Sequence, residues 1–265
     1  MIVIGEKINA TVPEVKKIFL AQDREALLEL AIEQAAAGST YIDVNVGTGV
    51  GGQQHEMSAM KWAIETIQDE IDTPICIDSA DPVILEEGLK AREGRPALIN
   101  SVKAGDKKSE EIIGLAKRFN LPLVALAMNT SGIPKTCGDR LLACQQIVDQ
   151  CHDIKFPLDH LYFDPLVVPI STDSQQGLLT LRTIREIKKK FPDTKTIIGL
   201  SNISYGLPAR SKINSAFLHM AIYEGLDAVI LDPLDEEVVQ AVKTAEAISD
   251  RDCHFRRFMR SYRVN

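Results

Sequence analysis

The chain has 265 residues, of which 45% are apolar and 25% charged, a composition typical of a globular protein with a substantial core. Its formal net charge of -7 argues against a nucleic-acid partner, because a nucleic-acid surface needs an excess of Lys and Arg to neutralise phosphates. No apolar run is long enough to cross a bilayer and no signal segment opens the chain, so we expect a cytoplasmic protein that does not act at a membrane. The five cysteines, an odd number, are expected to be free thiols in a reduced compartment.

Short apolar or β-branched runs alternate with amphipathic stretches along the whole chain, which is the pattern of repeated strand–helix units. The runs are nearly continuous apolar segments, as in parallel strands that are covered on both faces. After the third run, Asp81 and Pro82 predict a helix cap followed by proline at the first helical position, and Asp232 with Pro233 is expected to open the last helix similarly. The eight expected strands span residues 2–5, 41–46, 74–78, 97–101, 122–128, 160–164, 196–201 and 228–231.

Eight strand–helix units predict a single (β/α)8 barrel of the TIM type, because one such α/β domain typically runs to roughly 250 residues. No linker, composition shift or low-complexity tract marks a boundary, so the predicted barrel domain spans residues 1–265. An open doubly wound sheet is the alternative, since it uses the same strand–helix unit and only the number of units favours closure.

Polar side chains gather at the carboxyl ends of the predicted strands, where the active site of a barrel lies. A single Asp or Asn at such a place is usually a helix cap or a turn residue. A closed barrel brings all of them around one mouth, however, and a lining rich in acceptors suits a flat ligand with adjacent N–H donors, such as a pterin ring. Asp43 precedes Asn45 on the same side of its strand and is expected one layer deeper. The full set is Asp43, Asn45, Asp78, Asn100, Asn129, Asp164 and Asn202.

Several other catalytic devices are disfavoured by the residues present. No G-x-S-x-G nucleophile elbow occurs, and the histidines lack metal-ligand spacing, so we predict neither a serine hydrolase nor a bound metal. No lysine falls within a predicted strand, and Lys7, just after the first strand, is the nearest candidate for Schiff-base chemistry. Positioning and electrostatics remain, and Asn202, whose amide both donates and accepts, is the catalytic candidate.

Seven motifs at these places resemble the pterin-binding methyltransferases, and most closely the methyltetrahydrofolate:corrinoid methyltransferases of anaerobic bacteria. They are IGEKIN at residues 4–9, IDVNVG at 42–47, CIDS at 76–79, INS at 99–101, MNTSGIP at 128–134, YFDPL at 162–166 and GLSN at 199–202. The resemblance implies transfer of the N5-methyl group between methyltetrahydrofolate and the cobalt of a corrinoid (cobalamin) carried by a separate protein. The implied context is acetogenic one-carbon metabolism or O- or N-demethylation, and the implied assembly is a homodimer.

The resemblance also implies roles for individual residues. Those matching Asp78, Asn100 and Asp164 hold the pterin ring, and the one matching Asn202 hydrogen-bonds near N5. We therefore expect Asn202, Asp78 and Asp164 to be catalytic, and Arg210 is a candidate partner for the anionic benzoyl-glutamate tail. The expected substrate-binding set is Asp43, Asn45, Asp78, Asn100, Asn129, Asp164, Gly199, Ser201, Asn202 and Arg210.

Two other functions stay open at this point. An enzyme like dihydropteroate synthase uses the same barrel and pterin edge, but the serine-rich loop after the first strand and the late Ser-Arg-Lys stretch of that enzyme are missing here. A non-catalytic folate-binding protein would keep Asp78, Asn100 and Asp164, but would have no need of Asn202.

Overall fold

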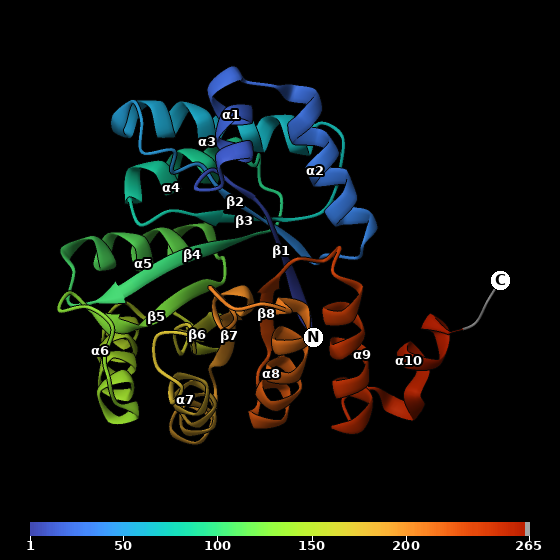
Figure 1. Ribbon diagram of the computed structural model, residues 1–265. Coiled ribbons are helices and arrows are strands. Elements are labelled where there is room, and N and C mark those ends of the chain that lie inside the picture. Colours follow the sequence, from blue (N-terminus) through green and yellow to red (C-terminus); the bar gives the residue numbers. More distant parts are fainter. Residues whose placement is uncertain (263–265) are drawn as a thin grey trace.

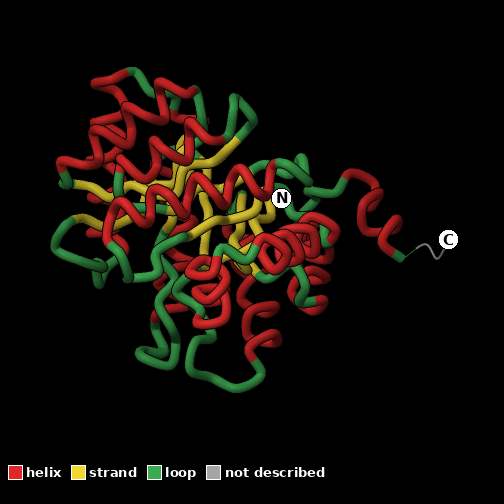
Figure 2. The backbone as a smooth tube through the Cα atoms, turned by 90° about the horizontal axis from the view of Figure 1, so that it is seen from above, coloured by secondary structure: helices red, strands yellow, loops and turns green. Residues whose placement is uncertain are grey.

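The computed structural model describes residues 1–262, so residues 263–265 of the predicted domain lie outside the described part. Eight parallel strands follow one another in chain order and close into a barrel, because β1 pairs with both β2 and β8 (Figure 1). Figure 2 shows the strands at the centre with helices around them. The predicted TIM barrel is confirmed, and the open sheet is wrong.

The strands are short and fall within a few residues of the predicted runs. They are β1 Ile2–Asn9, β2 Tyr41–Asn45, β3 Ile75–Asp78, β4 Ala97–Ala104, β5 Leu123–Asn129, β6 Leu161–Asp164, β7 Lys195–Gly199 and β8 Ala228–Leu231. The α-helices are α1 Pro13–Ala21, α2 Arg24–Ala36, α3 Gly52–Gln68, α4 Pro82–Ala91, α5 Lys107–Phe119, α6 Cys137–Ile154, α7 Gln176–Lys190, α8 Arg210–Glu224, α9 Glu236–Ile248 and α10 Arg256–Ser261. Short 3-10 turns are η1 Leu158–His160, η2 Leu200–Asn202 and η3 Cys253–Phe255.

The strands β1 and β4 run further than the sequence indicates. A register shift between Gly5 and Ile8 lets β1 continue until Asn9 lies opposite Asn45 of β2. Lys7 therefore lies within β1, Lys103 within β4 and Lys195 at the start of β7, so the expectation that no strand contains a lysine is wrong.

One predicted helix start is confirmed and one is wrong. The Asp81 carboxylate caps α4 by accepting a hydrogen bond from the Val83 N–H at 3.0 Å. The last long helix is capped instead by Asp235, which accepts from the Val238 N–H at 3.3 Å. Asp232 accepts from the N–H of Leu234 at 3.0 Å, within the turn that precedes α9, and so cannot be that cap.

The barrel interior is largely apolar below the strand ends. Ile4, Cys76, Leu98, Val124, Tyr162, Ile197 and Ala228, one residue from nearly every strand, form a single buried cluster there. A larger cluster fills the space between strands and helices. The polar strand-end residues lie above the apolar layers, at the carboxyl ends of the strands. All five cysteines are free thiols, as predicted, and no helix within residues 1–262 is long and apolar enough to cross a membrane.

Candidate active site

Three of the predicted site residues form one row across neighbouring strands. Asn45 of β2 lies opposite Asp78 of β3, and Asp78 lies opposite Asn100 of β4. The amide Nδ2 of Asn45 donates a hydrogen bond to Oδ2 of Asp78 at 2.7 Å, and its Oδ1 accepts one from the N–H of Gly47 at 3.0 Å. The Asn45 amide is thereby fixed in orientation, and it holds the Asp78 carboxyl group in place.

Asp43 lies one layer below this row, as its spacing from Asn45 predicts. It is opposite Cys76 in the register and only 4% exposed, and it accepts a hydrogen bond from Nδ2 of Asn100 at 3.4 Å. Burial and the charge of Asp78 raise the pKa of Asp43 well above its ordinary value, and burial also raises the pKa of Asp78. The pair therefore keeps a proton to higher pH than isolated aspartates do.

Asp164 reaches the mouth from the end of β6, two strands beyond Asn100. Its Oδ1 accepts a hydrogen bond from the N–H of Leu166 at 2.7 Å, which fixes the carboxyl group against the following turn. Burial raises the pKa of Asp164 to about 6, although the Leu166 N–H and the charge of Arg140 act in the opposite direction. The group is thus ionised near neutral pH and available as an acceptor.

Asn202 lies at the end of the 3-10 turn η2, which directly follows β7. Its side chain is exposed, and its Nδ2 lies close over Gly199, because a Cβ atom built on Gly199 would stand 3.3 Å from it. A glycine at this position allows the close approach. The catalytic candidate is therefore a surface-facing amide at the rim of the mouth.

Glu6 is a site residue that the sequence analysis missed. It belongs to the part of β1 beyond Gly5, and its Oε1 accepts a hydrogen bond from Oγ of Ser201 at 2.5 Å. Burial raises the pKa of Glu6 above its ordinary value. Its spacing from Ile2 and Ile4, which both face the barrel interior, was the available signal, because alternate residues of a strand face the same side.

Arg210 and Asn129 are both engaged in local structure. Arg210 donates from Nη2 to the backbone oxygen of Ser201 at 2.7 Å and from Nε to Oγ of Ser204 at 3.1 Å, so it braces the turn that carries Asn202. Asn129 accepts from the Ser131 N–H at 2.9 Å within its own turn. Hydrogen bonds join Asn45 to Asp78, Asn100 to Asp43 and Ser201 to both Glu6 and Arg210, whereas the bonds of Asn129 lie outside this network.

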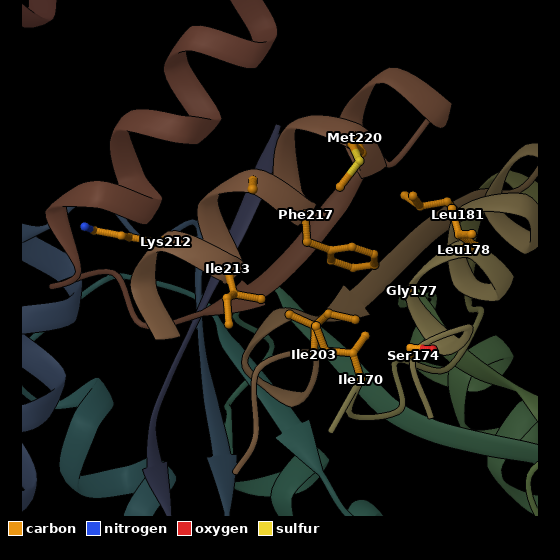
Figure 3. A pocket seen from close by; sticks show the side chains of 11 residues that line it. Ile170, Ser174, Gly177, Leu178, Leu181, Ile203, Lys212, Ile213, Phe217 and Met220 are labelled. Atoms are coloured by element: carbon orange, nitrogen blue, oxygen red, sulfur yellow. The ribbon is translucent and has the colours of Figure 1, made fainter. Parts of the chain in front are cut away.

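An apolar groove lies apart from this site. This groove of about 390 Å³ lies between α7 and α8, outside the barrel, and Figure 3 shows Leu178, Phe217 and Met220 around it. It lacks the carboxylate and amide groups of the mouth. Within residues 1–262, no group of three or more His, Cys, Asp or Glu side chains is arranged to hold a metal ion.

Residues 5–232 match the model of a family described as pterin binding enzyme. The chain belongs to the pterin-binding enzyme family. This match covers the strands that carry Glu6, Asp78, Asn100 and Asp164. The predicted family is therefore confirmed.

Two curated relatives are similar to this chain over most of its length. The chain is 32% identical over 265 residues to a methylcorrinoid:tetrahydrofolate methyltransferase of Eubacterium limosum, covering 99% of this chain and 96% of that protein. It is 30% identical over 246 residues to methionine synthase of Mycobacterium tuberculosis (strain ATCC 25618 / H37Rv), covering 87% of this chain but 20% of that protein. Of these two likenesses, the first spans nearly the full length of both chains.

Solved structures of dihydropteroate synthases share the fold. The enzyme of Vibrio fischeri ES114 gives a TM-score of 0.72 at 20% identity, covering 94% of this chain and 93% of that chain. The enzyme of Stenotrophomonas maltophilia gives 0.73 at 17% identity, covering 93% of this chain and 92% of that chain. At such identities the likeness concerns the barrel alone.

Proposed function

We propose that this chain transfers the N5-methyl group between methyltetrahydrofolate and the cobalt of a corrinoid that a separate protein carries. The observation that carries the proposal is the row of Asn45, Asp78 and Asn100, in which Asn45 fixes Asp78 through a 2.7 Å hydrogen bond. The full-length likeness to a methylcorrinoid:tetrahydrofolate methyltransferase supports the type of reaction.

In the proposed complex the pterin ring lies flat across the mouth. A carboxylate accepts two hydrogen bonds from the adjacent N–H and NH2 groups of a pterin edge, and an amide both donates and accepts. Asp78 and Asp164, from β3 and β6, would meet opposite parts of the ring, and Asn100 would complete the edge. The ring would cover the carboxyl groups, which strengthens these hydrogen bonds by excluding water.

Asn202 is proposed to act at N5. When the methyl group leaves, cobalt(I) supplies the electron pair of the new Co–C bond, and the electrons of the C–N5 bond return to N5. An amine leaves readily only if N5 gains a proton or a strong hydrogen bond in the transition state. In the opposite direction N5 attacks the methyl group, the electron pair of the Co–C bond returns to cobalt as cobalt(I), and N5 loses its proton. The exposed Asn202 amide, held over Gly199, can exchange donor and acceptor roles between these states.

The corrinoid protein is proposed to dock on the face of the barrel where the strands end. Exposed apolar side chains occur in three loops of that face: Val50 is 48% exposed, Ile133 54% and Tyr205 67%. Such side chains around a polar mouth are typical of a protein-docking surface.

We also propose a homodimer, on the family resemblance, and the apolar groove between α7 and α8 is the kind of surface that association covers. Light scattering tests the assembly.

A direct assay tests the proposed reaction. The purified protein is mixed without oxygen with methyltetrahydrofolate and free cob(I)alamin, and the absorption spectrum is followed. We expect the cob(I)alamin bands to give way to those of methylcobalamin, in proportion to enzyme. Folate binding without any spectral change would contradict a methyltransferase and favour the folate-binding alternative. Formation of dihydropteroate from a pterin pyrophosphate and aminobenzoate would favour the synthase instead.

A further inference from the structure

A fully buried arginine lies behind the Asp164 side of the mouth. Arg140, in the first turn of α6, is 0% exposed. Its Nη1 donates to the backbone oxygens of Pro165 at 2.7 Å and Leu166 at 2.9 Å, and its Nε donates to that of Pro134 at 3.3 Å. Burying a cation is costly, and carbonyl dipoles offset only part of the cost. A charge kept at such a place calls for a reason beyond packing.

The turn to which Arg140 donates is strained, and it directly follows Asp164 in the chain. Leu166 has a φ of 70°, in the left-handed region that a leucine rarely adopts. Its N–H is bound by the Asp164 carboxylate at 2.7 Å, and its oxygen by Arg140 at 2.9 Å and by Oγ1 of Thr180 at 3.0 Å. Strained conformations persist only where the surroundings fix them from several sides. Leu166 is therefore the link through which Arg140 fixes the Asp164 carboxyl group.

Arg140 is also the cation that acts on Asp164. Its charge lowers the pKa of Asp164, against the larger effect of burial, which raises that pKa to about 6. The other titratable groups beside the two are thiols of α6, Cys137 and Cys144, and burial raises the pKa of Cys144 so that it stays neutral. The charge of Lys190 of α7 acts on Cys144 in the opposite direction and lowers its pKa.

We propose that Arg140 is a positioning residue of the pterin site, which holds the Asp164 carboxylate, through the Leu166 turn, in the orientation and charge state that an N–H edge requires. This inference rests on the proposed function, because it assumes that Asp164 accepts hydrogen bonds from the pterin. Thr180 also donates a hydrogen bond to the Leu166 oxygen, but its side chain is uncharged. The charge is the part of the role that only Arg140 supplies.

Two variants separate the charge of Arg140 from its shape. Arg140→Gln keeps a donor for the turn carbonyls but loses the charge, whereas Arg140→Lys keeps the charge but loses the planar fork. The dissociation constant of methyltetrahydrofolate is measured over a range of pH by fluorescence or calorimetry. In the wild type, affinity is expected to fall below about pH 6, where Asp164 becomes protonated.

The expected result is a shift of that pH limit in one variant only. In Arg140→Gln the fall begins about one pH unit higher, so affinity near pH 6.5 drops roughly threefold and recovers at about pH 8.5. In Arg140→Lys the affinity is expected to fall at the same pH as in the wild type, although it is lower at every pH. Equal losses at all pH values in both variants would overturn the inference, because they indicate structural support alone.

Failure of the inference is distinguishable from failure of the proposed function. A wild type that does not bind methyltetrahydrofolate at any pH overturns the proposed function. A wild type that binds, with the same pH limit in wild type and Arg140→Gln, overturns the inference alone. Thermal unfolding of both variants checks that they are folded. If Arg140→Gln does not fold, Arg140→Lys tests the inference alone. A change in the pH at which its folate affinity falls would contradict the role of charge.

Discussion

Asn45 and Asp78 form a registered pair across β2 and β3, and the amide of Asn45 donates to the carboxyl group of Asp78 at 2.7 Å. The bond uses one oxygen of Asp78 and fixes the plane of the group. A pterin edge placed on the other side of Asp78 then meets an acceptor that needs no reorientation, and pre-organisation of this kind lowers the cost of binding.

Asp78→Asn should weaken the affinity for methyltetrahydrofolate roughly 10- to 100-fold, because an amide NH2 replaces an acceptor and hydrogen bonds to charged groups contribute about 1.5–3 kcal/mol. Calorimetric titration measures the change. Asp106→Asn is a matched control, since it exchanges the same groups at the N-cap of α5, away from the row. A similar loss in both variants would show that Asp78 has no special part in binding.

Asn202→Ala should lower the rate of methyl transfer roughly 10- to 100-fold and leave folate affinity within about twofold, because the amide is needed as charge changes at N5 and not in the ground state. Single-turnover kinetics with cob(I)alamin, together with binding titrations, separate the two quantities. Equal losses of rate and affinity would indicate uniform binding and speak against this role.

Gly199→Ala should slow transfer several-fold by displacing Asn202, because the added Cβ would stand 3.3 Å from Nδ2. The double variant Gly199→Ala/Asn202→Ala should be no slower than Asn202→Ala alone, since both changes remove the same contact. A double-mutant cycle on the transfer rate measures this. Fully additive losses would mean that Gly199 acts in some other way.

Asp164→Asn should stabilise the fold at high pH while it weakens folate binding. The pKa of Asp164 is raised from 3.8 to about 6, so its protonated form favours the folded state, and that contribution is present below about pH 4 and lost as the pH rises through about 6. The amide avoids this loss, which amounts to about 3 kcal/mol at about pH 8. Urea unfolding of both proteins at about pH 4 and about pH 8 measures this difference in stability. A variant less stable than the wild type at about pH 8 would contradict the expectation.

Ile133→Asp should slow methyl transfer to the protein-bound corrinoid several-fold and leave the reaction with free cob(I)alamin unchanged. The side chain is 54% exposed in the loop between β5 and α6, so a charge there disturbs docking and not the fold. Ile248→Asp, at the C-terminal end of α9 and 84% exposed, is the control, because this helix end lies away from the face where the strands end. An equal effect on both acceptors would place Ile133 in the reaction itself.

The sequence predicts the fold well because a parallel barrel repeats one local pattern. Each strand is an apolar run and most end in polar residues, so the amino-acid order alone indicates that Asn45, Asp78 and Asn100 lie at neighbouring strand ends. Closure is not visible in this way, because pairing of β1 with β8 depends on residues at opposite ends of the chain.

The missed features are those that depend on distant neighbours. Glu6 is polar and follows a glycine, so the sequence predicts a strand that ends at Gly5, but pairing with β2 continues the strand after a register shift. Nothing in the sequence around Arg140 distinguishes it from an ordinary helix residue. Only the folded chain brings the carbonyl groups of Pro165 and Leu166 to it. Similarly, the sequence points to Asp232 as the cap of the last helix, and only the folded chain, in which Asp232 binds the N–H of Leu234, shows that Asp235 is the cap.

The hydrogen bond between Glu6 and Ser201 joins residues 195 positions apart, and β1 is held by β8 as well as by β2. A growing polypeptide on the ribosome therefore carries an unfinished mouth, with one edge of β1 lacking its partner, until the segment up to Leu231 has emerged. Contacts over such separations form slowly, since the loop between them must be closed first. The proposed folate site is consequently complete only late in synthesis, when the first strand meets the last.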